Sequence, residues 1–128
     1  MARLADYRLR FPLASRRWGG GVADIFPMPG DEVWGGLWLI ATTDSPALDA
    51  QEGVHHKPPR YFREQVEVEV PAGDRVNCLI YRVTASAAVD TDLGPSVTYR
   101  DTMLRGAYSF QLPAAYVARI EELSIVEA

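Results

Sequence analysis

Glu52 is the residue in this sequence whose type and setting best suit it to chemistry, and it lies in a short acidic turn at residues 48–54. A carboxylate can take up a proton as a general base and return it as a general acid. It works best when a partly apolar site raises its pKa towards neutrality. A glutamate followed by Gly53 is weak evidence by itself, so this hypothesis depends on the rest of the chain.

A metal site is one alternative use of the same region. His55 and His56 follow the turn, and Cys78 lies further along the chain in an apolar run. Adjacent histidines on an extended segment point in different directions, and a cysteine in such a run is typical of strand core. We therefore expect no metal. We interpret Cys78, the only cysteine, as a buried inert thiol that cannot form an intramolecular disulfide.

Nucleotide binding and covalent catalysis are not indicated either. The glycine run at residues 19–21 lacks the Lys-Ser/Thr pair of a P-loop and the spacing of a dinucleotide fingerprint, so tight packing explains it better. The serines lack the Gly-framed turn of a nucleophile elbow. The four in question are Ser15, Ser45, Ser86 and Ser96.

Several other conspicuous residues are interpreted as structural. Three tryptophans are many for the surface of a small domain, so at least two should fill core or rim, while a ligand wall stays open for Trp18. Asp31 and Glu32 lie where a predicted turn meets a predicted strand, and Asp is a common turn former. A structural role is favoured for both acids.

The composition indicates one soluble globular domain, residues 1–128. The chain has 48% hydrophobic and 23% charged residues, and 13 basic against 17 acidic residues give a net charge of −4. Without a basic stripe, nucleic acid is not an expected partner. No apolar stretch approaches the roughly 20 residues needed to span a bilayer, so we expect no membrane insertion. A single cysteine and no signal-type apolar core fit the cytoplasm.

Period-two patterns predict that strands come first along the chain. The clearest alternates valine and glutamate at residues 66–70, and the turn 71–74 joins it to a partner strand. The predicted strands cover residues 7–11, 22–26, 32–40, 61–70 and 75–83, with a turn at 28–31.

Helices are predicted mainly in the last third. A short helix is expected at residues 47–51, and longer ones at 96–106 and 113–123, the last behind a proline that suits a helix start. Strands followed by helices predict a single α+β domain. Its sheet should be mixed or mostly antiparallel and barrel-like, with a few helices at one side.

Several blocks of sequence, in this order, resemble the gamma-glutamylcyclotransferase family. The first are Gly20-Gly21-Val22-Ala23-Asp24-Ile25, Pro29-Gly30-Asp31-Glu32-Val33-Trp34-Gly35 and the Glu52 turn. Cys78-Leu79-Ile80-Tyr81, Pro95-Ser96-Val97-Thr98-Tyr99, Gly106-Ala107 and Leu112-Pro113-Ala114-Ala115-Tyr116 extend the similarity almost to the C-terminus.

This resemblance implies an enzyme that cyclises a γ-glutamyl amino acid or amine to 5-oxoproline, with Glu52 as the general acid/base. It implies that Tyr61 and Tyr99 line the substrate pocket, and we count Gly20 and Gly21 among the substrate-binding residues. No metal or cofactor is implied. Glutathione, γ-glutamyl dipeptides and γ-glutamylated biosynthetic intermediates all remain open as the small-molecule substrate.

The start of the chain departs from the family pattern. Family members begin with a strand and a Tyr-Gly-Ser-Asn type loop that holds the glutamyl group, whereas this chain starts at a segment resembling an internal one. We therefore expect a domain shortened at its N-terminus, either from a misplaced gene start or from a real difference in function. A missing strand would invite a partner strand or a homodimer. The alternative function is a non-catalytic binding or interaction module.

Overall fold

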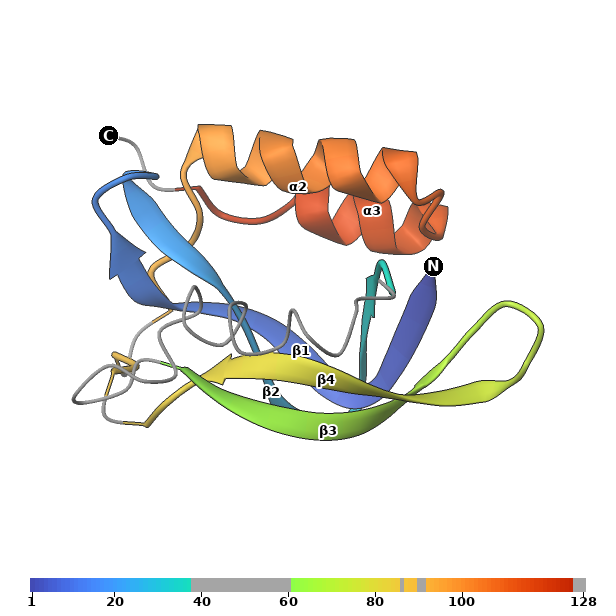
Figure 1. Ribbon diagram of the computed structural model, residues 1–128. Coiled ribbons are helices and arrows are strands. Elements are labelled where there is room, and N and C mark those ends of the chain that lie inside the picture. The colour runs from blue at the N-terminus through green and yellow to red at the C-terminus, as the bar shows by residue number, and fades with distance from the viewer. Residues whose placement is uncertain (38–60, 86, 90–91, 126–128) are drawn as a thin grey trace, which may run out of the picture.

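The structure, a computed structural model, describes residues 1–37, 61–85, 87–89 and 92–125. The strands are β1 (Ala2–Ser15), β2 (Gly20–Gly35), β3 (Tyr61–Glu69) and β4 (Arg75–Val83), and the helices are α2 (Val97–Ser109) and α3 (Ala114–Glu121). The strands form one antiparallel sheet in the order β2-β1-β3-β4, and the two helices lie together over one side of it (Figure 1). This confirms the α+β class. Backbone pairing among the described residues does not close the sheet into a barrel.

β1 and β2 form a long hairpin whose register runs from Ala2 opposite Gly35 to Ser15 opposite Gly20. Both predicted strands of the first thirty residues lie inside it. The sequence predicts that a turn at residues 28–31 ends the second strand. This prediction is wrong, because β2 continues through these residues.

Residues 28–31 instead form an irregularity within β2. The register shifts so that these residues lie opposite Asp6 of β1, whose φ of 62° is in the left-handed region. The Asp6 carboxylate accepts a hydrogen bond from the Gly30 N–H at 3.0 Å. Pro27 and Pro29 fit here because β2 is an edge strand of the sheet, where a missing N–H need not cost a ladder bond. The turn residues therefore bend the strand without ending it.

β3 and β4 confirm the second predicted hairpin. Val68 is buried and Val66 packs beside it, whereas Glu67 and Glu69 are exposed, as the alternation predicts. Two backbone hydrogen bonds close the turn at residues 71–74: the Val70 N–H donates to the Asp74 carbonyl at 3.0 Å, and the Gly73 N–H donates to the Val70 carbonyl at 2.9 Å. This hairpin is joined to β1 through a single register pair, Arg3 opposite Glu69.

The two helices predicted in the last third also lie where the sequence places them, whereas the short helix expected at residues 47–51 lies outside the described residues. Ser96 caps α2, because its hydroxyl accepts a hydrogen bond from the Tyr99 N–H at 3.2 Å. Pro113 stands at the N-cap of α3. An ion pair between Arg119 of α3 and Asp31 of β2, at 2.9 Å, ties the helical layer to the hairpin, in agreement with the structural role expected for that aspartate.

Among the described residues, two clusters of buried apolar side chains contribute to the core. One joins the helices to β2 and consists of Ala107, Tyr116, Val117 and Ile120, with Val33 and Trp34 against it. The other fills the space between the two hairpins and consists of Ala2, Leu4 and Val68, with Ile25, Cys78 and Ile80 against it.

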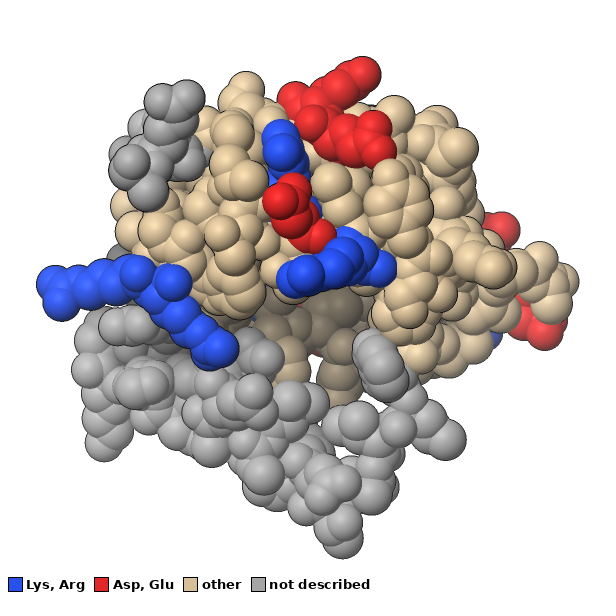
Figure 2. Space-filling model, turned by 90° about the horizontal axis from the view of Figure 1, so that it is seen from above, with Lys and Arg blue, Asp and Glu red and all other residues tan. Residues whose placement is uncertain are grey.

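The face that carries the helices bears both signs of charge (Figure 2). Arg100 and Asp101 of α2 form one pair of opposite charges, with their nearest charged atoms 3.7 Å apart. Neither helix in the described ranges has the length and apolar character needed to cross a membrane.

Candidate active site

Tyr99 is held at the N-terminal end of α2 by contacts with both strands of the first hairpin. Its hydroxyl oxygen accepts a hydrogen bond from the Ala23 N–H of β2 at 2.9 Å. Its ring meets Trp18 edge-on, with 5.1 Å between the ring centroids, and Phe11 edge-on at 6.2 Å. Trp18 thus packs directly against Tyr99, the predicted pocket residue. In this place its ring can also line one wall of the predicted substrate pocket.

Gly20 and Gly21 lie in a place where no side chain fits. A Cβ on Gly21 would lie 2.7 Å from the Phe11 carbonyl oxygen, and a Cβ on Gly20 would lie 2.7 Å from the Ser96 nitrogen. The Gly21 N–H donates to the Gly94 carbonyl at 2.8 Å. These contacts support the tight-packing interpretation of the glycine run and bring it next to the start of α2.

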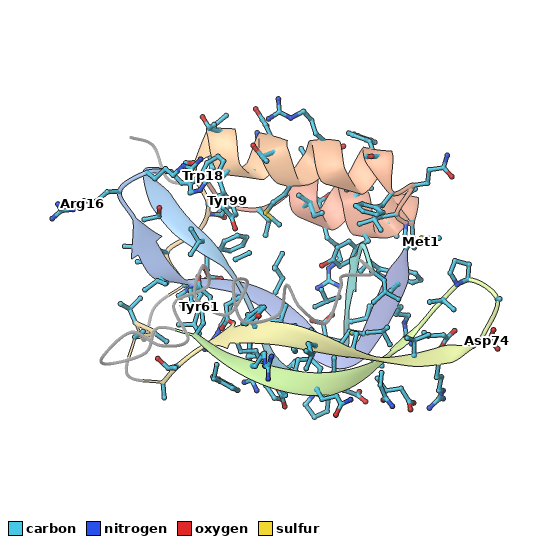
Figure 3. The ribbon with its side chains drawn as sticks, viewed as in Figure 1. Met1, Arg16, Trp18, Tyr61, Asp74 and Tyr99 are labelled. Atoms are coloured by element: carbon cyan, nitrogen blue, oxygen red, sulfur yellow. The ribbon has the colours of Figure 1, made fainter. Side chains whose placement is uncertain are left out.

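Tyr61 opens β3 opposite Val83, the last residue of β4, and is half-buried. Figure 3 shows it at the same end of the molecule as Trp18 and Tyr99, while Asp74 in the β3–β4 turn lies at the other end. The structure therefore brings the two predicted pocket tyrosines to one end of the sheet, from elements that are far apart in sequence.

The two edge strands meet at this end through side chains. Asp24 Oδ1 accepts a hydrogen bond from the Val83 N–H at 2.9 Å, and Arg82 Nε donates to the Ile25 carbonyl at 3.1 Å. We call these four residues the seam. The seam connects to both tyrosines, because Ala23, which binds the Tyr99 hydroxyl, precedes Asp24 on β2, and Tyr61 pairs with Val83. These contacts bring the two edge strands together at this end, while the backbone pairing of the sheet stays open.

Asp24 joins three strands at this end of the sheet, and sequence reasoning did not identify it as part of the site. Its side chain is fully buried, and Oδ2 accepts from Arg10 Nε at 2.8 Å. The available signal was a single acid within the otherwise apolar segment 22–26. A buried carboxylate needs partners, and these come from strands that the sequence alone could not place beside it.

Glu52, His55 and His56 lie outside the described residues, so the predicted acid/base and the two histidines are not part of the geometry above. Among the residues whose positions are given, no group of three or more His, Cys, Asp or Glu side chains could hold a metal ion. Cys78 is half-buried on β4, and burial raises the pKa of its thiol.

A separate hollow of about 450 Å³ lies between the helices. Ala107, Tyr108 and Leu112 line one side, and Val117, Ala118 and Glu121 line the other. None of the predicted site residues that the structure describes contributes to it. Its lining is mostly apolar helix packing, and it lies apart from the tyrosine end of the sheet.

Comparisons with known proteins identify relatives of this chain. The model of the AIG2-like family matches residues 32–120. A gamma-glutamylcyclotransferase from Bos taurus is 35% identical over 127 residues, which is 96% of this chain and 64% of that protein. The crystal structure of an uncharacterized protein from Homo sapiens matches with a TM-score of 0.90 at 33% identity, covering 99% of this chain and 74% of that one. A gamma-glutamyl cyclotransferase structure matches equally well, with a TM-score of 0.90 at 32% identity and the same coverage.

The chain spans 64% of the length of the curated relatives that it matches. The similarity extends through β1, β2, the Glu52 turn and the helices, because nearly the whole of this chain is aligned. The resemblance and the fold class expected from the sequence are both confirmed.

Proposed function

The chain belongs to the AIG2-like family and is a relative of gamma-glutamylcyclotransferases, and from this we propose that it cyclises a γ-glutamyl amino acid or amine to 5-oxoproline. The observation that carries the proposal is the similarity to named gamma-glutamylcyclotransferases over 96% of the chain. The placement of Tyr61 and Tyr99 at one end of the sheet is consistent with it.

In the proposed reaction the substrate supplies its own nucleophile. Glu52 removes a proton from the substrate α-ammonium group, and the resulting amine attacks the γ-carbonyl carbon. A C–N bond forms to close the five-membered ring, and the C–N bond to the amino acid or amine breaks. Glu52 then returns the proton to the departing nitrogen, and the second proton lost from the new ring nitrogen passes to the released amine. The amine leaves as an ammonium ion, so that atoms and charge balance without a cofactor. General acid/base catalysis of this kind contributes about 10² to 10⁴ in rate.

The tyrosines would hold the glutamyl part of the substrate. A tyrosine hydroxyl can hydrogen-bond a carboxylate or an amine, and Tyr61 and Tyr99 approach from separate elements. Fixing the substrate in a folded conformation raises the rate of ring closure, because the amine and the carbonyl are then held in attack geometry. We assign Gly20 and Gly21 to the part of the pocket near Tyr99, where their close packing supports the start of α2.

The test is to incubate the purified protein with γ-glutamyl dipeptides, glutathione and γ-glutamyl amines, and to measure 5-oxoproline by liquid chromatography and mass spectrometry. We expect turnover of at least one compound by the wild type. Glu52→Gln should reduce turnover at least about 10²-fold, because the amide cannot accept the proton. Glu122→Gln is the control, since Glu122 is an exposed acid at the end of α3.

No 5-oxoproline from the wild type across the whole panel would reject the proposal for this chain. Equal turnover by the wild type and Glu52→Gln would reject the role of Glu52 while keeping the activity. The panel also identifies the leaving amine, because each substrate releases a different one. Production from glutathione would place the protein in glutathione metabolism.

We also propose a cytoplasmic location and assembly as a homodimer. A single cysteine is consistent with the cytoplasm, where thiols stay reduced. A homodimer would cover exposed strand edges. Sedimentation of the purified protein would measure the assembly directly.

A further inference from the structure

Asp24 stands out because it is a fully buried carboxylate in a strand whose neighbouring residues are apolar. Its two oxygens have different partners: Oδ1 accepts from the Val83 N–H at 2.9 Å, and Oδ2 accepts from Arg10 Nε at 2.8 Å. Burying a charge is costly unless it is paired and hydrogen-bonded, so this arrangement holds strands β1, β2 and β4 together at one point.

The contacts of Asp24 lie next to those of the two predicted pocket tyrosines, Tyr61 and Tyr99. Ala23, the residue before Asp24, donates its N–H to the Tyr99 hydroxyl. Val83, which Asp24 binds directly, is the cross-strand partner of Tyr61. The Asp24 carboxylate is therefore linked to both tyrosines. Its own residue follows Ala23, which binds Tyr99, and its hydrogen-bond donor Val83 pairs with Tyr61.

We propose that Asp24 is a positioning residue for the active site, which sets the separation and orientation of Tyr61 and Tyr99 by fixing β2 to β4. It does not touch the substrate in this assignment. The kinetic part of the inference rests on the proposed cyclotransferase function, whereas the placement of the tyrosines does not.

Asp31 provides a matched comparison on the same strand. Its carboxylate is also paired with arginines, Arg119 at 2.9 Å and Arg8 at 3.6 Å. It ties β2 to α3 at the opposite end of the strand from the glycine run. Its hydrogen bonds within the described residues, with Glu32 and Arg119, involve no residue next to Tyr61 or Tyr99. A general loss of stability should affect both sites, whereas a loss of tyrosine positioning should follow only from changes at Asp24.

The first experiment measures position without activity. Asp24→Leu keeps the branched shape but removes both acceptors, and Asp24→Asn keeps one acceptor for the Val83 N–H. In NMR spectra of the folded proteins, the ring protons of Tyr99 are sensitive to its edge-on contact with Trp18. We expect Asp24→Leu to shift the Tyr99 signals, Asp24→Asn to shift them less, and Asp31→Leu to leave them unchanged.

The second experiment is a double-mutant cycle on 5-oxoproline formation. Asp24→Leu should lower kcat/KM by about tenfold to hundredfold, because small displacements of positioning groups slow ring closure. In a Tyr99→Phe background, the further loss should fall below about threefold, since part of what Asp24 positions has already been removed. Asp31→Leu should change kcat/KM by less than about twofold.

The outcomes separate the two proposals. If the wild type makes no 5-oxoproline, the proposed function fails and the NMR comparison alone decides the role of Asp24. If Asp24→Leu does not fold, Asp24→Asn provides the same comparison with a smaller expected effect. Tyr99 signals that do not move in a folded Asp24 variant, or that move equally in the Asp31 control, would overturn the inference. Losses that multiply fully with Tyr99→Phe would overturn its kinetic part.

Discussion

Replacing Gly21 with alanine tests how tightly the glycine run packs against the start of the helical layer. The new Cβ would lie 2.7 Å from the Phe11 carbonyl oxygen, 2.8 Å from the Phe11 Cβ and 3.1 Å from the Gly94 carbonyl oxygen. Two of these three atoms belong to the backbone, so no side-chain rotation can relieve the overlap. The strands must move apart, which also strains the 2.8 Å hydrogen bond from the Gly21 N–H to Gly94.

The magnitude follows from three effects. Overpacking of this kind costs about 1–3 kcal/mol, and weakening the hydrogen bond costs up to about 1 kcal/mol. Alanine restricts the unfolded chain, which returns about 0.4–1 kcal/mol. We therefore expect Gly21→Ala to lower the free energy of unfolding by about 2 kcal/mol, which corresponds to a fall in Tm of about 6–10 °C for a domain of this size.

Urea unfolding followed by circular dichroism gives the free energy of unfolding, and a thermal scan gives Tm. Gly106→Ala is the matched control, because Gly106 lies inside α2 and a Cβ there would meet nothing within 4 Å. That change should stabilise the protein by about 0.5–1 kcal/mol. Equal stability of Gly21→Ala and wild type, or the same sign of change at both glycines, would refute the packing argument.

Two predictions concern pH. Burial raises the pKa of Tyr116, so above its ordinary value near 10 the unfolded chain loses this proton while the folded protein retains it, and stability falls as pH rises. Tyr116→Phe should therefore show a smaller loss of unfolding free energy between about pH 8 and pH 10.5 in urea titrations, and a loss equal to that of the wild type would contradict this. The hydrogen bond from Arg119 lowers the pKa of Asp31, so its contribution is present above the ordinary carboxyl value near 4 and is lost as pH falls through the folded pKa. Asp31→Asn should cost about 0.5–1 kcal/mol at pH 7 and reduce the loss of stability between about pH 5 and pH 3. An unchanged acid dependence measured by the same titrations would show that this pair does not contribute.

Local patterns predicted the second hairpin well and the first one only in part. The alternation at residues 66–70 and the turn at 71–74 are contained within consecutive residues, so nothing distant was needed to interpret them. The turn-forming residues 28–31 wrongly predict a strand end, because their effect depends on Asp6, more than twenty residues earlier. Turn-forming residues end some strands and only bend others. Which of the two happens depends on the partner strand, and the local sequence does not show that strand.

The assignment of the candidate site depends on resemblance more than on local pattern. Tyr61 and Tyr99 carry no local signal, and their common location arises from the contacts of Ala23, Asp24 and Val83. Asp24 could have been noted as an acid among apolar residues. Its role depends on which strands surround it, and that information exists only in the tertiary structure.

The way in which the two hairpins are joined also sets an order of events in folding. Each hairpin closes over a short local turn, whereas the bond from Val83 to Asp24 joins residues 59 positions apart. Closing a segment of that length costs about 2 kcal/mol more in chain entropy than closing a turn of a few residues. We expect the hairpins to form early and the seam to close late. Changes in the seam should then speed unfolding more than they slow folding, so the tyrosine end of the sheet is where the native protein begins to open.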